Sequence, residues 1–183
     1  MKRTISIAFC ALAISAGAFA QAPDQAAIDK ALQAAPGNLK ATATVIKWKP
    51  DYTYDTLKTG TGNLVCYDKS GLPGQQAIMI ECTSKGNLPR AAQNMKMDAL
   101  GDKKTAQAAL DAAEKDGTRV KPEFGSVWYH VMGADAEHQR THMTIAVPGA
   151  TTASMGLPDN GKSGGVWIMN AGTTTAHLMT PGE

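Results

Sequence analysis

The sequence predicts an α+β domain built mainly on an antiparallel sheet, with one helix at its N-terminus and a pair of helices in its middle. Three observations lead to this prediction. β-Branched residues nearly vanish between Leu88 and Gly117, where Ala, Gln, Lys, Met and Asp dominate. Apolar and alternating segments of strand length occur on both sides of this region. The connections among those segments are short, and short connections favour antiparallel pairing.

The first expected elements are a helix and a strand. Residues 21–35 carry a Pro-Asp pair near their start and are followed by Pro36-Gly37, which are helix start and stop signals. Residues 41–48 alternate in polarity, so we expect a strand that ends before Pro50. Residues 51–63 contain two glycines, and we expect them to form a connection.

The two cysteines downstream of the N-terminal segment lie in a predicted hairpin. Residues 64–67 and 77–82 are expected strands, and residues 68–74 between them are rich in turn formers. Cys66 and Cys82 would then face each other near the base of the hairpin. We expect a disulfide, which contributes about 3 kcal/mol for a loop of this size. A redox or metal-binding pair is the alternative, but C-x-x-C spacing is absent.

Two consecutive helices are expected between Leu88 and Gly117. Gly101 interrupts the helical composition, and Asp102 is a good N-cap for the second helix. The second helix has small and apolar residues at helical spacing, and Gly117 ends it.

Strand patterns return after the helices. Residues 126–132 are apolar on both faces, which predicts a buried central strand. Residues 141–147 alternate cleanly, so we expect Met143, Ile145 and Val147 to point inward and His142 to face solvent. Residues 165–170 and 175–180 are expected to form a final strand pair.

The N-terminal twenty residues are typical of a secretory signal peptide. Lys2-Arg3 provides a positive start, residues 5–19 carry no charge, and Ala18-Phe19-Ala20 fits the small-x-small cleavage pattern. We therefore expect cleavage between Ala20 and Gln21. The predicted organisation is a signal peptide at 1–20 and a single α+β domain at 21–183, secreted or periplasmic.

Cleavage changes the charge of the expected protein. The 18 Lys and Arg residues include Lys2 and Arg3, so the cleaved chain would have as many basic as acidic residues, which number 16. It contains no basic run of the kind that follows phosphates, so nucleic acid is not an expected partner. No segment of the mature chain reaches the about 20 apolar residues that span a bilayer.

One motif suggests nucleotide binding, but its context argues against it. Gly156–Ser163 fits G-x-x-x-x-G-K-[ST] at every position. A phosphate-binding loop must follow a strand and open a helix. Here the residues after the loop are Gly164-Gly165 and then a predicted strand. We therefore reject nucleotide binding and expect a surface loop between strands.

Histidine and methionine recur together near the C-terminus. His130 and Met132 share a His-x-Met spacing with His177 and Met179. Residues i and i+2 of a strand point to the same face, so each pair would present an imidazole beside a thioether. Two such strands placed as neighbours would form a two-His, two-Met site suited to copper. The simpler interpretation is that these methionines are core residues beside half-buried histidines.

The C-terminal segment resembles a known group of proteins. Residues 165–181 read GVWIMNAGTTTAHLMTP, His130–Met132 form a His-x-Met strand, and Cys66 is followed by Asp68 and Gly71. In these three segments the chain resembles a group of small, functionally uncharacterised secreted bacterial proteins that close on an Ala-His-Leu-Met strand followed by proline. The resemblance implies secretion and a shared fold, and it implies no activity. The helical region and the Gly-Lys-Ser loop are not part of it.

These patterns favour a non-catalytic function. The leading hypothesis is an exported binding or envelope-associated protein whose ligand and partners are unknown. The first alternative is a periplasmic copper-binding protein that uses His130, Met132, His177 and Met179. The second alternative is an exported hydrolase, although no catalytic residue can be assigned and Ser154 lacks the first glycine of a nucleophile elbow.

Overall fold

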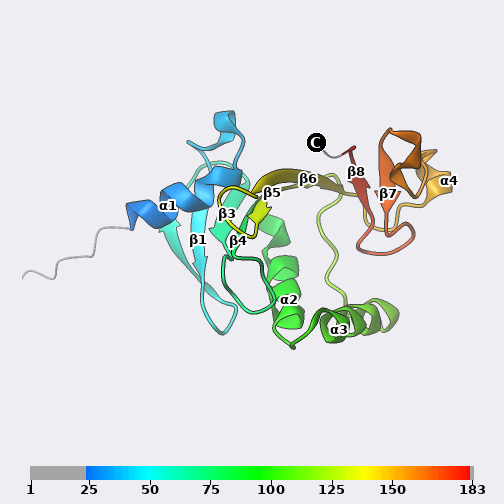
Figure 1. Ribbon diagram of the computed structural model, residues 1–183, viewed down its shortest axis with the longest axis horizontal. Coiled ribbons are helices and arrows are strands. Elements are labelled where there is room, and N and C mark those ends of the chain that lie inside the picture. Colours follow the sequence, from blue (N-terminus) through cyan, green and yellow to red (C-terminus); the bar gives the residue numbers. More distant parts are fainter. Residues whose placement is uncertain (1–23, 182–183) are drawn as a thin grey trace, which may run out of the picture.

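The computed structural model describes residues 24–181, and the predicted signal peptide and its cleavage point lie outside the described residues. Within that range the chain forms one eight-stranded sheet with helices packed against it (Figure 1). The helices are α1 (Gln25–Ala31), α2 (Leu88–Asp98), α3 (Lys103–Lys115) and α4 (Thr152–Met155). The strands are β1 (Thr44–Trp48), β2 (Tyr54–Lys58), β3 (Leu64–Asp68), β4 (Ile78–Ser84), β5 (Val127–Gly133), β6 (Arg140–Ala146), β7 (Trp167–Met169) and β8 (His177–Met179).

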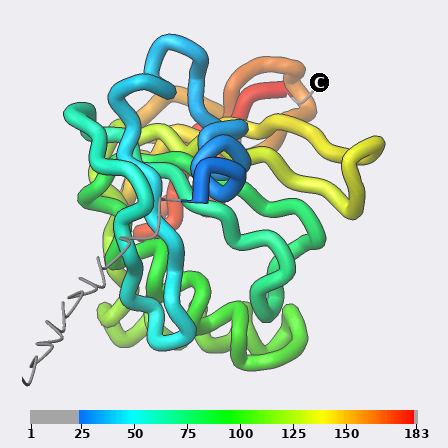
Figure 2. The backbone as a smooth tube through the Cα atoms, turned by 90° about the vertical axis from the view of Figure 1, so that its left-hand side faces the viewer, coloured from blue at the N-terminus to red at the C-terminus, as the bar shows by residue number. Residues whose placement is uncertain are grey.

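The strand order across the sheet is β2-β1-β3-β4-β5-β6-β8-β7. Every neighbouring pair is antiparallel except β1 and β3, which run parallel. The predicted α+β class with a mainly antiparallel sheet is therefore confirmed. The β5–β6 hairpin projects from the body of the molecule, as the yellow loop in Figure 2 shows.

The central helix pair forms where the composition changes. The Asp102 carboxylate accepts hydrogen bonds from the backbone N–H groups of Lys104 and Thr105, which makes it the N-cap of α3. The preceding helix, α2, has proline in its first turn, where the missing N–H costs no hydrogen bond.

One strand differs from the prediction. Residues 51–63 were expected to form a connection, yet β2 lies within them and pairs with β1. β2 is an edge strand, and Tyr54, Asp55 and Thr56 are exposed. An edge strand with exposed polar side chains lacks the apolar alternation that identifies a strand from sequence.

The two faces of the sheet are covered by different helices. On one face, α1 and the short 3-10 helix after it pack against β1, β3 and β4 through Ile28, Ala31 and Ile80. On the other face, α2 packs through Leu88 and Ala91. A third, smaller cluster joins β7, β8 and the loops around them. The sheet is therefore a middle layer, with α1 and α2 on opposite sides.

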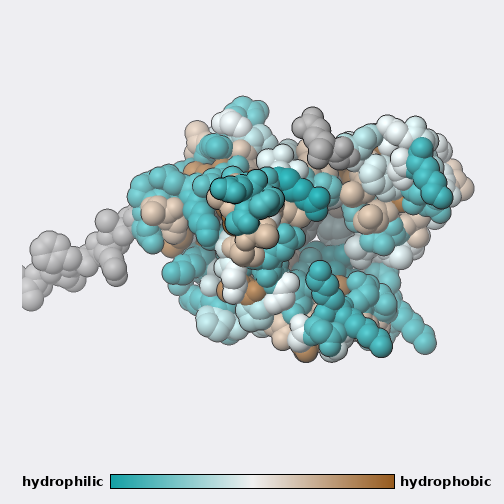
Figure 3. Space-filling view, in the orientation of Figure 1, coloured by the Kyte–Doolittle hydropathy of each residue, from teal (hydrophilic) through white to brown (hydrophobic). Residues whose placement is uncertain are grey.

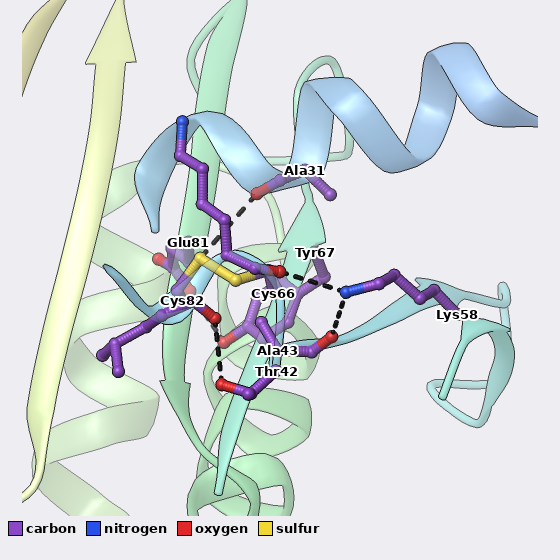
Figure 4. Close-up of a disulfide and its surroundings, with 10 residues drawn as sticks. Ala31, Thr42, Ala43, Lys58, Cys66, Tyr67, Glu81 and Cys82 are labelled. Carbon is purple, nitrogen blue, oxygen red and sulfur yellow. Dashed lines mark hydrogen bonds between the residues drawn. A yellow bond between two sulfur atoms is a disulfide. The ribbon is translucent and has the colours of Figure 1, made fainter. Parts of the chain in front are cut away.

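The predicted disulfide is present in the β3–β4 hairpin (Figure 4). Cys66 and Cys82 are directly opposite in the antiparallel register, and their Cα atoms are 4.1 Å apart. Both residues are fully buried under α1, and the Cys82 sulfur lies 3.7 Å from the carbonyl oxygen of Ala31. The bridge therefore belongs to the core between α1 and the sheet.

The Gly-Lys-Ser loop does not have the context of a nucleotide site. Gly156 caps the C-terminus of the four-residue helix α4 in a left-handed conformation. Residues Gly161–Ser163 form one 3-10 turn, and strand β7 follows. A phosphate-binding loop needs the reverse order, a strand before the loop and a helix after it. Separately, none of the helices within residues 24–181 is long and apolar enough to cross a membrane.

Candidate functional site

A cleft lies between α2 and the sheet face formed by β4, β5, β6 and β8. Its volume is about 290 Å³. In Figure 3 the surface is indented between the part that carries β7 and β8 and the part that carries α3. The residues that line the cleft come from the sheet, from α2 and from two loops: Glu81, Arg90, Asn94, Pro122, Trp128, His130, Met132, His142, Thr144, Ala146, Thr175, Ala176 and His177.

Strand register explains why these side chains share one face. His130 on β5 is opposite Glu81 on β4 and opposite His142 on β6. Trp128 and Thr144 are opposite each other two residues further along the same strand pair. Because alternate residues of a strand point to the same side, all five side chains face α2.

Two imidazoles face each other across the β5–β6 pair. The ring centroids of His130 and His142 are 5.9 Å apart, with 30° between the ring planes. Trp128 stacks with His130, with ring centroids 6.4 Å apart and 12° between the ring planes. His142 is half-buried in the cleft rather than facing solvent, so that part of the prediction was wrong. The sequence shows which residues alternate, but not that the opposite face is covered by α2.

The environment of His142 keeps its imidazole neutral. Burial lowers the pKa of His142 below its ordinary value, and the nearby charges of His130, Arg140 and His177 lower it further. Each of these effects disfavours the imidazolium form.

Behind His130 lies a buried carboxylate. Glu81 Oε1 is 2.6 Å from Lys69 Nζ, and both side chains are 5% exposed. The Tyr67 hydroxyl donates a hydrogen bond of 2.9 Å to Glu81 Oε2. Burial alone would raise the pKa of Glu81, but the Lys69 ammonium and His130 outweigh burial and hold that pKa well below its usual range. Glu81 is therefore a carboxylate anion at neutral pH.

Glu81 also orients His130. Its Oε1 lies 3.4 Å from His130 Nδ1, and that nitrogen is buried without a hydrogen bond of normal geometry. The carboxylate is thus in position to accept a hydrogen bond from an Nδ1–H group if the contact shortens. Because Nδ1 faces Glu81, the second ring nitrogen, Nε2, lies on the side of the ring away from the carboxylate.

The α2 wall of the cleft is fixed by Arg90. Its guanidinium is buried and donates hydrogen bonds to the Val120 carbonyl and to the hydroxyls of Thr174 and Thr175. Burial and the charge of Arg119 lower the pKa of Arg90 to about 10, against the opposing effect of Glu114. Arg90 stays charged at neutral pH, and these contacts engage both of its terminal nitrogens.

The predicted copper ligands lie on one side of the sheet but do not lie on neighbouring strands. His130 and Met132 are on β5, His177 and Met179 are on β8, and β6 runs between them. The backbones of β5 and β8 are therefore about 10 Å apart across the sheet. Their registers are also offset, because His130 is opposite His142 whereas His177 is opposite Ala146. The neighbouring-strand arrangement that the two-His, two-Met hypothesis required does not occur.

The individual contacts of these residues agree with that conclusion. His177 Nδ1 is 2.7 Å from the Thr175 carbonyl oxygen, and Met132 Sδ lies 4.0 Å from an Arg140 guanidinium nitrogen. In the range 24–181, no three His, Cys, Asp or Glu side chains gather closely enough to hold a metal ion by themselves. His138 lies apart from the cleft in the β5–β6 hairpin and pairs with Asp135.

Sequence reasoning missed the buried charged residues of the site. Glu81 occurs in the apolar stretch Ile-Met-Ile-Glu-Cys, and a lone acid at a core position of a strand is the signal that points to it. The sequence predicts Lys69 in a turn and Arg90 in a helix. Their partners come from other elements and cannot be found from local pattern.

Comparisons with known proteins identify no family for this chain. No family model, no curated protein and no solved structure matches the chain. The resemblance of the C-terminal segment to small secreted proteins therefore stays an expectation.

Proposed function

We propose that this protein is an exported, non-catalytic binding protein that takes a small ligand into the cleft between α2 and the β4–β5–β6–β8 face. The observation that carries the proposal is the preformed cleft itself. Ligand sites are concave, mostly apolar and furnished with a few polar groups that fix orientation. Here Trp128, Met132 and Ala146 provide the apolar surface, and the imidazoles of His130 and His142 provide the polar groups.

The walls of the cleft are joined to the rest of the domain by hydrogen bonds and an ion pair. Arg90 ties α2 to the loop before β8, and the Glu81–Lys69 pair fixes the floor beneath His130. A site with fixed side chains loses little conformational entropy on binding. This favours a binding role for the cleft over a purely structural gap.

A hydrolase receives less support from the same residues. Nucleophilic catalysis needs a hydroxyl or thiol activated by an adjacent base. Within residues 24–181 no Ser, Thr or Cys side chain is hydrogen-bonded to a histidine ring, and both cysteines of this range are in the disulfide. We therefore place the hydrolase behind the binding protein.

Export is the part of the proposal that rests on the sequence and the cysteines. Disulfides persist in oxidising compartments such as the periplasm and the extracellular space. The buried Cys66–Cys82 bridge supports such a compartment, in agreement with the signal-like first twenty residues.

The binding proposal is tested by mapping ligands with NMR. The ¹⁵N-labelled protein is titrated with a fixed panel of glycine, glutamate, histidine, glucose and citrate at millimolar concentration. At least one compound should shift the Trp128 indole signal and the amides of β5 and β6. Thr144→Phe fills the cleft and should weaken that binding at least tenfold.

Thr141→Phe is the matched control. It places the same substitution on the same strand, at an exposed position on the opposite face, and should bind like the wild type. Shifts confined to surfaces outside the cleft, or equal binding by both variants, would contradict the proposal.

A further inference from the structure

We propose that His130 and His142 form a binding site for a divalent transition-metal ion, with copper(II) the preferred ion and Glu81 supporting His130 from behind. The inference names the ligand of the cleft and therefore rests on the proposed function. It differs from the ligand set predicted from sequence, because it replaces the His-x-Met pairs of two separated strands with a cross-strand pair on adjacent strands.

The spacing of the two rings suits a shared ion. Imidazole nitrogens bind such metals at about 2.0–2.1 Å, so two rings that share one ion have centroids about 5 to 6.5 Å apart. The observed centroid distance between His130 and His142 is 5.9 Å. The two residues are directly opposite in the register, so both side chains leave the sheet toward the same space.

Glu81 supplies the partner that metal-binding histidines usually have. A ligating histidine commonly donates its other ring N–H to a carboxylate, which fixes the ring and makes the ligating nitrogen more basic. Glu81 Oε1 is in that position, 3.4 Å from His130 Nδ1. The His130 Nδ1 atom is buried with no other partner, and a tightened contact with Glu81 would satisfy it.

Imidazole binds a metal ion through a ring nitrogen that carries no proton. For His130 that nitrogen is Nε2, because Nδ1 faces the Glu81 carboxylate.

The charged groups around His130 and His142 do not form a binding site for an anion. From α2, Arg90 faces the cleft, but both of its terminal nitrogens already donate hydrogen bonds, to Val120, Thr174 and Thr175. From β6, Arg140 lies against Met132 Sδ, so Met132 is not counted as a ligand. Among the described residues that line the cleft, Glu81 is the only carboxylate, and it lies on the His130 side.

The remaining coordination positions would be taken by water from the open side of the cleft. A site with two protein ligands has modest affinity, and for nitrogen donors copper(II) binds most tightly among the divalent ions of the first transition series. Zinc and nickel are therefore expected to bind the same pair more weakly.

The test adds one equivalent of copper(II) chloride to the purified, disulfide-bonded protein at pH 7.5. Electron paramagnetic resonance should show hyperfine coupling to two imidazole nitrogens, and NMR signals of β5 and β6 should broaden first. His130→Ala and His142→Ala should each weaken copper binding at least tenfold. His138→Ala is the matched control, because that exposed histidine lies outside the cleft, and it should bind like the wild type.

Two variants test whether Glu81 is a positioning residue for His130. Glu81→Gln should weaken copper binding about tenfold or more, the effect expected when the supporting carboxylate is lost. Because this change leaves Lys69 buried and unpaired, the double variant Glu81→Gln/Lys69→Met is measured beside it. The double variant should fold and still show the weakened binding.

The outcomes separate this inference from the proposed function. If copper binding survives both His130→Ala and His142→Ala, or is absent in the wild type, the metal assignment is wrong. If an organic compound of the NMR panel then still binds in a way that Thr144→Phe blocks, the cleft remains a ligand site. If neither copper nor any panel compound binds there, both proposals are wrong.

Discussion

Glu81 lies directly opposite His130 across the β4–β5 pair, with its Oε1 3.4 Å from the Nδ1 of the imidazole. The same oxygen is 2.6 Å from Lys69 Nζ. One buried carboxylate therefore both neutralises a buried lysine and contacts a histidine of the cleft. The stability of the sheet and the geometry of the candidate site depend on the same residue.

Glu81→Gln should destabilise the protein strongly. Removing one partner of a buried ion pair costs about 3–5 kcal/mol, because the remaining charge is left without compensation. Here that charge is Lys69, whose side chain is 5% exposed. Urea denaturation at pH 7 measures the loss. Glu81→Gln/Lys69→Met should recover most of it, and equal stabilities of the single and double variants would contradict the account.

The depressed pKa of Glu81 predicts acid sensitivity. The carboxylate titrates at a lower pH in the folded protein than in the unfolded chain, so the unfolded state binds more protons as the pH falls. The stabilisation is complete above the unfolded pKa, about 4.3, and decreases progressively below it. Urea denaturation between pH 7 and pH 3 should therefore show a steeper decline for the wild type than for Glu81→Gln/Lys69→Met. Parallel profiles would show that Glu81 is not responsible.

Loss of the disulfide should lower stability without changing the cleft. Cys66→Ala/Cys82→Ala should reduce the free energy of unfolding by about 3 kcal/mol, mainly because the unfolded chain gains conformational entropy without the cross-link. Both cysteines are fully buried on the α1 side of the sheet, away from His130 and His142. Thermal denaturation measures the stability, and the NMR titration checks that ligand binding persists. A variant as stable as the wild type would contradict a structural role for the bridge.

Arg90 should contribute more to the stability of the protein than the exposed Arg140 does. Arg90→Met removes charged hydrogen bonds that join α2 to residues 120 and 174–175, and such bonds contribute about 1.5–3 kcal/mol each. We expect a loss of about 3 kcal/mol in urea denaturation, because methionine keeps part of the packing. Arg140→Met is the control, since that residue is exposed, and it should change stability by less than about 1 kcal/mol. Equal effects of the two variants would contradict the role assigned to Arg90.

The sequence predicts most of this architecture because the elements carry local signals. Asp102 caps a helix where it was expected, and Cys66 and Cys82 pair as the hairpin pattern required. β2 was missed because an exposed edge strand needs no apolar alternation. The parallel pairing of β1 with β3 was missed because it joins strands that are not consecutive along the chain.

The candidate site was harder to predict than the fold. His130 was identified from its neighbour Met132, but its contacts are with Glu81 and His142 on the adjacent strands. Those contacts depend on register between strands, which local pattern does not specify. His142 was assigned to the solvent side because alternation does not reveal that helices cover both faces of this sheet.

The location of a bound copper ion tests most directly the central claim that His130 and His142 together bind copper(II) in the cleft. Crystals are soaked in copper(II) chloride, and an anomalous difference map is calculated at the copper absorption edge. The account predicts the strongest peak between the imidazoles of His130 and His142, about 2.0–2.1 Å from a nitrogen of each. A strongest peak elsewhere, for example beside His138, or no peak in the cleft at all, would contradict it.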